Sequence, residues 1–150
     1  GGVTVTVPTE GMEKKDPAFV KGNQVTLHGK QAEAFVRYRD TDYHFTALYR
    51  MDQQQEYITQ YFQAVKAASK TDSQIVVHLF DMIQDYMVTD MSVGEMGNVA
   101  NMIINSEDKG ELSIKGTNAI AKDDGFNEFT MDETSRGEVA MELFFNKVEK

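Results

Sequence analysis

The stretch HGKQAEAFVRYRDTDYHFTALYRMDQQQEYI, residues 28–58, decides the fold of the first half of the chain. Small and apolar residues recur at helical spacing after Gly29, which predicts a helix with an inward face of Ala32, Ala34, Phe35 and Val36. The sequence DTDYH, residues 40–44, predicts a turn or loop. A second helix is predicted over residues 47–69, with an apolar stripe of Ile58, Tyr61, Phe62, Val65 and Ala68.

The elements on either side of this stretch indicate a mixed α/β chain. Residues 3–7 alternate β-branched side chains up to Pro8 and predict a strand, and residues 25–27 predict a second, short strand. Two sequences of the capping-box type, at residues 71–74 and 92–95, predict the starts of two further helices.

The end of the chain predicts a hairpin followed by a helix. Residues 111–121 and 126–131 read as two strands around the turn sequence DDG. Asp132 caps a last helix, whose core-facing residues are Val139, Ala140, Leu143 and Phe144. We therefore expect an α/β fold, a mixed sheet flanked by helices, with residues 1–150 forming a single region.

Charged residues are distributed unevenly between the two halves of this 150-residue chain, whose net charge is −9. Residues 1–70 carry nine Lys/Arg and eight Asp/Glu, whereas residues 71–150 carry six and sixteen. An acidic chain without a basic stripe repels nucleic acid, so no nucleic-acid partner is expected. Cysteine is absent, which excludes disulfides, thiol catalysis and cysteine-based zinc sites.

Arg37 and Arg39 are candidates for an anion site. Residues two apart point the same way in extended backbone but diverge by about 200° in a helix, so a joint site requires the first helix to end near Arg37. Arginine binds phosphate through two parallel hydrogen bonds and keeps its charge at any working pH. The alternative is that both arginines are solvated and paired with Asp40 and Asp42.

Arg50 and Gln54 are four residues apart on the second predicted helix and share one face of it. They would add a third cation and an amide donor to the same site. The alternative is an exposed helix face, because Asp52, Gln53, Gln55 and Glu56 around them are all polar.

No motif for an activated nucleophile or a metal site is present. The HExxH, P-loop and GxSxG patterns are all missing from the sequence. The adjacent carboxylates Glu107–Asp108 and Asp123–Asp124 predict solvated turns. We predict no catalytic residue and no metal ligand in this chain, and any chemistry would act through charge stabilisation of a phosphoryl group.

Taken together, these motifs resemble the LytR–CpsA–Psr family. Members carry a GGV strand ending in Pro, a Leu-x-Gly-x-Gln-Ala element, an Arg-x-Arg pair and an Arg-x-x-x-Gln element. All occur here in order: Gly1-Gly2-Val3 with Pro8, Leu27-x-Gly29-x-Gln31-Ala32, Arg37-x-Arg39 and Arg50-x-x-x-Gln54. The likeness covers residues 1–70 well and residues 111–150 loosely.

The resemblance implies a membrane-anchored protein of the bacterial cell envelope. Such proteins transfer glycopolymers from a polyprenyl-pyrophosphate carrier to peptidoglycan or another wall acceptor, with arginines on the pyrophosphate and aspartates on Mg²⁺. By resemblance, the pyrophosphate-binding residues here are Arg37, Arg39, Arg50 and Gln54. The implied location is the extracellular face of the cytoplasmic membrane.

The chain also departs from the family pattern. By comparison with the family pattern, we expect the family's first half, with its magnesium-binding aspartates, and its membrane anchor to lie outside this chain, and HFTALY replaces the family's usual approach to Arg50. We expect the C-terminal half of an incomplete α/β/α domain, inactive alone, without a cofactor of its own, and able to form a homo-oligomer. The alternative is a non-catalytic envelope module that keeps the fold and binds a partner or an anionic glycan.

Overall fold

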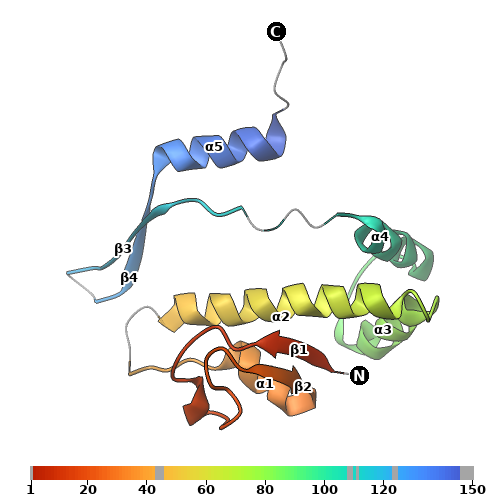
Figure 1. The fold of residues 1–150 in the computed structure, drawn as a ribbon. Coiled ribbons are helices and arrows are strands. Elements are labelled where there is room, and N and C mark those ends of the chain that lie inside the picture. The colour runs from red at the N-terminus through yellow and green to blue at the C-terminus, as the bar shows by residue number, and fades with distance from the viewer. Residues whose placement is uncertain (1, 43–45, 108–109, 111, 123–124, 146–150) are drawn as a thin grey trace. The chain divides into compact units, whose positions relative to one another are not determined.

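The computed structural model describes residues 2–42, 46–107, 110, 112–122 and 125–145. They belong to two compact units, Gly1–Glu107 and Asp108–Lys150. The first unit holds, in order, β1 (Val3–Thr6), η1 (Met12–Lys14), β2 (Gln24–Leu27), α1 (Gly29–Arg37), α2 (Thr46–Ala68), α3 (Ile75–Ile83), η2 (Gln84–Tyr86) and α4 (Val93–Asn105) (Figure 1). The second unit holds β3 (Gly116–Ile120), β4 (Asn127–Met131) and α5 (Glu133–Phe144).

The predicted α/β class is confirmed. The described strands pair into two antiparallel two-stranded sheets, β1 with β2 and β3 with β4. In the first sheet, Val3 lies opposite Leu27 and Thr6 opposite Gln24. The alternation of valine and threonine along β1 buries the valines and exposes the threonines, as strand geometry requires.

The core of the first unit lies between this sheet and α1. Its buried apolar side chains are Val3, Val5, Val7, Met12, Phe19, Leu27 and Phe35. The rings of Phe19 and Phe35 meet edge to face with centroids 5.4 Å apart. Such a contact adds to the free energy gained by burying both rings.

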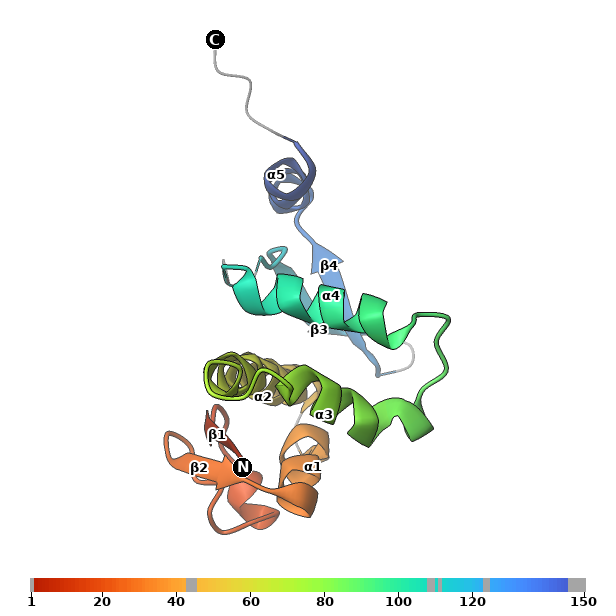
Figure 2. The same cartoon turned by 90° about the vertical axis from the view of Figure 1, so that its right-hand side faces the viewer.

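Helix α2 lies over the β1–β2 sheet and over α1 (Figure 2). The side chains of α2 that face this packed region are spaced four or seven residues apart: Thr46 and Gln53 are buried, and Tyr57 and Tyr61 pack on the core. The predicted stripe is therefore partly wrong, because Ile58 and Phe62 are each 49% exposed. The inner face of α2 contains buried polar side chains, and a pattern of apolar residues does not reveal them.

Glu56 of α2 also contacts the sheet. Its Oε1 accepts a hydrogen bond of 2.7 Å from the backbone N–H of Thr6. Because Thr6 lies on the edge strand β1, this carboxylate satisfies one donor that would otherwise be available to another strand.

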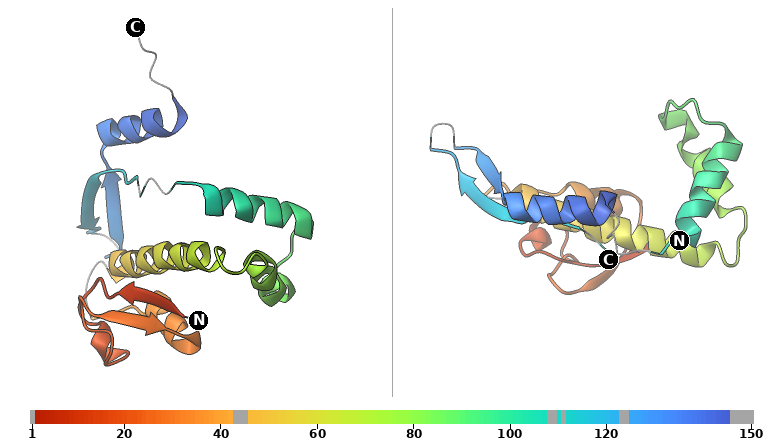
Figure 3. Two further views of the ribbon diagram at one scale, coloured as in Figure 1. Left: turned by 45° about the vertical axis from the view of Figure 1, so that its right-hand side comes forward. Right: turned by 90° about the horizontal axis from the view of Figure 1, so that it is seen from above.

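Helices α3 and α4 lie at the C-terminal end of α2 (Figure 3). The capping box predicted at residues 92–95 is confirmed, with Ser92 and Glu95 bonded reciprocally. The box predicted at residues 71–74 is wrong: Asp72 Oδ1 accepts from the N–H of Gln74 at 2.8 Å, and the N-cap of α3 makes no side-chain bond. An Asx turn has taken the place of the Thr–Gln pair.

The second unit is a hairpin followed by a helix, as predicted, but with shorter strands. Strand β3 covers only Gly116–Ile120 of the predicted 111–121, and Asp123–Asp124 lie outside the described residues. Asp132 caps α5 by accepting from the N–H of Ser135 at 2.8 Å. The core-facing prediction for α5 is wrong at Leu143 and Phe144, which are 57% and 77% exposed.

Candidate anion-binding site

The end of α1 sets the geometry of the candidate site. Arg37 is the last helical residue, and the next residue, Tyr38, has extended backbone with ψ 138°. The helix thus ends where a joint site of Arg37 and Arg39 requires it to end. The Tyr38 hydroxyl donates to the carbonyl of Gly11 at 3.2 Å, which ties the segment after the helix to the loop before η1.

Arg37 and Arg39 line one open pocket of about 520 Å³. Its other lining residues are Lys15, Lys30, Glu33, Ala34 and Tyr38. Four cationic side chains and one carboxylate therefore line a single surface pocket. In a chain whose net charge is −9, this excess of positive charge makes the pocket a candidate site for an anion.

The two arginines have different partners. Arg37 Nη1 donates to Glu33 Oε1 at 2.8 Å, one helical turn earlier, and its side chain is 75% exposed. Arg39 Nε donates to Thr46 Oγ1, the first residue of α2, at 2.6 Å. The alternative pairing with Asp40 and Asp42 is wrong, since in the described part of the chain neither arginine forms an ion pair with these two carboxylates.

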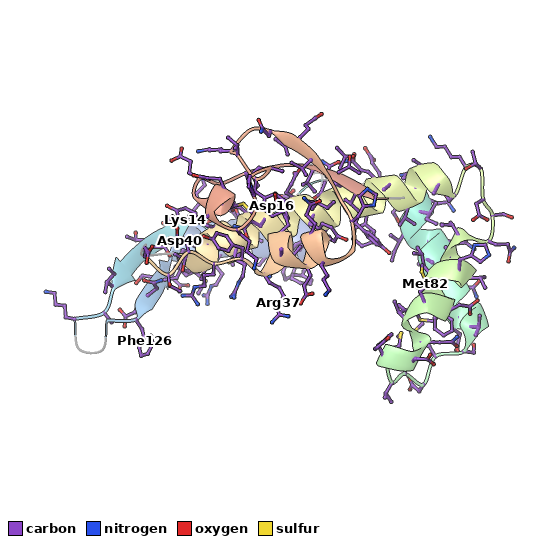
Figure 4. The ribbon with its side chains drawn as sticks, turned by 90° about the horizontal axis from the view of Figure 1, so that it is seen from below. Lys14, Asp16, Arg37, Asp40, Met82 and Phe126 are labelled. Carbon is purple, nitrogen blue, oxygen red and sulfur yellow. The ribbon has the colours of Figure 1, made fainter. Side chains whose placement is uncertain are left out.

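Asp40 and Asp42 bind Lys14 instead. Lys14 Nζ lies 2.8 Å from Asp40 Oδ2 and 3.3 Å from Asp42 Oδ2. Figure 4 shows Lys14 and Asp40 together, whereas Arg37 points away from them into solvent. The hydrogen bond from Lys14 holds the pKa of Asp40 below its usual value, and the two carboxylates raise the pKa of Lys14.

Gly11 allows this close packing. Its backbone is left-handed, with φ 81°, and a Cβ there would lie 3.3 Å from Asp40 Oδ2. A glycine is therefore favoured both by the backbone and by the neighbouring carboxylate.

Arg50 and Gln54 come from α2 and do not line the pocket. Gln54 Nε2 donates to the carbonyl of Val36 at 3.1 Å, so its amide is used to hold α2 against the last turn of α1. Arg50 is half-buried one turn after Thr46, on the same helix face, and forms no ion pair with any described residue. Arg39 is thus bonded to Thr46 of α2, one turn before Arg50.

The alternative of an exposed polar face around Arg50 fails at Gln53, which is 2% exposed. With its amide nitrogen toward α1, Gln53 donates to the carbonyls of Phe35 at 3.0 Å and Tyr38 at 3.1 Å. Its other amide atom lies 3.3 Å from Thr9 Oγ1. Helix ends leave carbonyls without partners, and Gln53 supplies the donors that the end of α1 needs.

The sequence did not point to Lys15, Lys30 or Glu33. The last two could have been found, because positions 30, 33 and 37 fall on one face of the predicted helix. Lys15 lies 22 residues before Arg37, and only the folded chain brings it to the same pocket.

The described residues do not fit a magnesium ion. They contain no group of three or more acidic or histidine side chains close enough to share a metal. The two carboxylates nearest Arg39 in sequence, Asp40 and Asp42, are held by the Lys14 ammonium. Mg²⁺ needs an octahedral set of oxygen donors, which these side chains do not provide.

None of the described helices combines the length and the apolar composition that crossing a membrane would demand.

Comparison with solved structures shows the fold. The Lin1025 protein of Listeria innocua superposes with a TM-score of 0.50 at 24% identity, over 94% of this chain and 57% of that one. Lmo1026 of Listeria monocytogenes gives a TM-score of 0.49 at 24% identity, over 94% and 56%. This chain thus spans a little over half the length of either structure. No curated protein matches it.

The family model of the LytR_cpsA_psr family matches residues 1–144, which is nearly the whole chain. This protein is therefore a member of the LytR–CpsA–Psr family.

Proposed function

We propose that this chain carries part of the pyrophosphate-binding site of an envelope phosphotransferase. The reaction is the transfer of a glycopolymer from a polyprenyl-pyrophosphate carrier to peptidoglycan or another wall acceptor. The proposed place of action is the extracellular face of the cytoplasmic membrane, reached through a membrane anchor elsewhere in the protein. Membership of a cell-wall-related family supports each of these points.

One observation carries the proposal. Arg37 and Arg39 line the same pocket as Lys15 and Lys30, in a chain whose net charge is −9. A diphosphate bears several negative charges on a small volume, and planar guanidinium groups match its oxygen pairs. Arg39 is the best-placed group, because Thr46 fixes its Nε while its two terminal nitrogens bond to no described residue.

Arg50 and Gln54 have supporting roles in this proposal. Arg50 follows Thr46 by one turn of α2 and would supply a third arginine charge. Gln54 holds α2 to α1 through the Val36 carbonyl, and it would reach the ligand only by giving up that bond.

Binding of pyrophosphate tests the proposal. The intact chain is titrated with pyrophosphate by calorimetry, together with Arg39→Ala and with Arg136→Ala of α5 as a matched control. A hydrogen bond to a charged group contributes about 1.5–3 kcal/mol, so Arg39→Ala should weaken binding about tenfold to a hundredfold. Equal binding of pyrophosphate by all three proteins would show that Arg39 does not belong to a pyrophosphate-binding site.

A second candidate is a non-catalytic envelope module with the same fold. It is favoured by the acidic side chains of the described residues, which do not form a magnesium site. In the transferase proposal the complete domain supplies Mg²⁺ from elsewhere, and this chain alone has no turnover. Magnesium-dependent release of product from a polyprenyl-pyrophosphate glycan by the purified chain would contradict both the external source of Mg²⁺ and the lack of turnover by this chain alone.

A further inference from the structure

We infer that Glu33 sets the affinity of the pocket for anions by competing for Arg37. The inference rests on the proposed function, since it concerns the same pocket. Glu33 is the only carboxylate among the described residues that line the cavity. Its Oε1 accepts a hydrogen bond from Arg37 Nη1 at 2.8 Å.

The positions of these side chains follow from helix geometry. Lys30, Glu33, Ala34 and Arg37 are spaced i, i+3, i+4 and i+7, so they line one face of α1. With a rise of 1.5 Å per residue, this face extends about 10 Å from Lys30 to Arg37. Ala34 leaves space in the middle of the face, and Lys15 and Arg39 approach it from the segments before and after the helix.

Glu33 therefore occupies the position that a ligand oxygen would take on Arg37. An anion that binds Arg37 Nη1 displaces this carboxylate and then remains near its negative charge. The pair is mostly exposed, with side chains 75% and 59% accessible, so its displacement costs little. The repulsion that remains increases with the charge of the ligand, which makes Glu33 a filter against small, highly charged anions.

Glu33 has a second property that concerns specificity. A carboxylate released from Arg37 accepts hydrogen bonds, and sugar hydroxyls donate them. A diphosphate joined to a sugar offers several hydroxyl donors to Glu33, whereas fully ionised inorganic pyrophosphate offers none. The pocket should therefore discriminate between these two ligands through this one side chain.

The test compares Glu33→Gln with the unmodified chain. Pyrophosphate and a soluble nucleoside-diphosphate sugar are titrated against both, with Glu10→Gln as the matched control. Glu10 is also an exposed glutamate with an ion-pair partner, Lys21 at 3.3 Å, and it does not line the pocket. Circular dichroism establishes whether the variants keep their helices.

We expect Glu33→Gln to bind pyrophosphate about threefold to tenfold more tightly, because one screened repulsion and one competitor are removed. The gain for the diphosphate sugar should be smaller, and Glu10→Gln should bind like the unmodified chain. In an Arg37→Ala background the effect of Glu33→Gln should shrink, because the competition acts through Arg37.

Failures of the two ideas can be told apart. If the unmodified chain binds pyrophosphate, Arg39→Ala weakens that binding and Glu33→Gln changes nothing, the inference is overturned and the proposed function stands. The inference is equally overturned if Glu10→Gln tightens binding as much as Glu33→Gln. If neither the unmodified chain nor Glu33→Gln binds either ligand, the pocket is not an anion site and both ideas fall.

Discussion

The first unit contains two regions that differ in how they use apolar residues. Among the described residues, the sheet, α1 and the inner face of α2 enclose one core of seven buried apolar side chains. Helix α3, with the sequence IVVHLFDMI, is rich in apolar residues and yet has no buried residue, and neither has α4. Figure 4 shows Met82 on α3, which is 64% exposed.

This difference shows that apolar content alone does not make a core. A helix that is apolar on most of its surface needs partners on several sides. In the packed region, Phe19 and Phe35 belong to one buried cluster with residues of β1, η1 and β2, whereas α3 has only α4 and η2 as described neighbours with extensive contact. Stability should therefore depend on the first region and respond little to changes in the second.

The largest effect is expected for Phe35→Ala. Phe35 is fully buried and packs edge to face on Phe19. Its truncation leaves a cavity and should lower the free energy of unfolding by about 3–5 kcal/mol. Urea unfolding followed by tyrosine fluorescence measures this, because the chain has no tryptophan and Tyr38, Tyr57 and Tyr61 pack on this core.

The matched change in the other region is Met82→Ala. An exposed side chain that buries little should alter the free energy of unfolding by no more than about 0.5 kcal/mol. A loss for Met82→Ala that approached the loss for Phe35→Ala would mean that α3 is packed in solution, and the contrast between the two regions would be wrong.

Gln53→Ala should have the next largest effect, of about 1–3 kcal/mol, because the carbonyls of Phe35 and Tyr38 lose the donor that the buried Gln53 amide supplies. Gln54→Ala is its neighbour and control. Gln54 is exposed and donates one hydrogen bond, to Val36, so its loss should cost less than about 1 kcal/mol. Thermal unfolding of both variants measures the difference, and equal losses would argue that α2 is rotated about its axis.

The positions of these two glutamines show how far the sequence could predict the fold. The alternating valines predicted β1 and the spacing of small residues predicted α1, because in both elements apolar side chains face the core. The inner face of α2 contains Thr46 and Gln53, which bond to groups that only the folded chain brings near. The apolar periodicity of this helix therefore predicted that Ile58 and Phe62 face the core, but both side chains are half exposed.

The candidate site was predictable to the same extent. The spacing of Arg37 and Arg39 implied a joint site if the helix ended between them, and α1 does end at Arg37. The contribution of Lys15 and the link from Arg39 to Thr46 depend on tertiary structure, and no local pattern encodes them. Binding at these residues stays a prediction.

Acid should weaken the packed region through Asp40. The hydrogen bond from Lys14 lowers the pKa of Asp40 below 3.8 in the folded state, so the unfolded state takes up a proton first as the pH falls. The stabilisation is complete above about pH 5 and is lost as the pH falls through the folded-state pKa.

Asp40→Asn tests whether the ionised Asp40 carboxylate causes this loss of stability at low pH. The variant should unfold at lower urea than the unmodified chain at neutral pH, and the gap should close as the pH falls through the lowered folded-state pKa of Asp40. Asp52→Asn, which removes an exposed carboxylate of α2 that bonds to no described residue, serves as the control. A gap that stays constant with pH would show that the loss comes from packing and not from the charge.

The smallest change in stability, and a clear change in assembly, is expected for Phe62→Ser. We predict that the chain self-associates through exposed apolar surface. The edge of β1 is less available than α2 for such a contact, because Glu56 already binds the N–H of Thr6. Phe62 and Ile58 are half exposed one turn apart on α2 and form an apolar patch.

Phe62→Ser should shift the free energy of unfolding by about 0.5 kcal/mol or less while weakening association about tenfold. Leu143→Ser of α5, where the side chain is 57% exposed, is the matched control and should leave association unchanged. Light scattering after size exclusion measures the assembly at low and high salt. Association through apolar area should persist at high salt, because screening weakens charge pairs far more than buried apolar contacts. A monomer across micromolar concentrations at both salt levels would show that these exposed faces need no partner in solution.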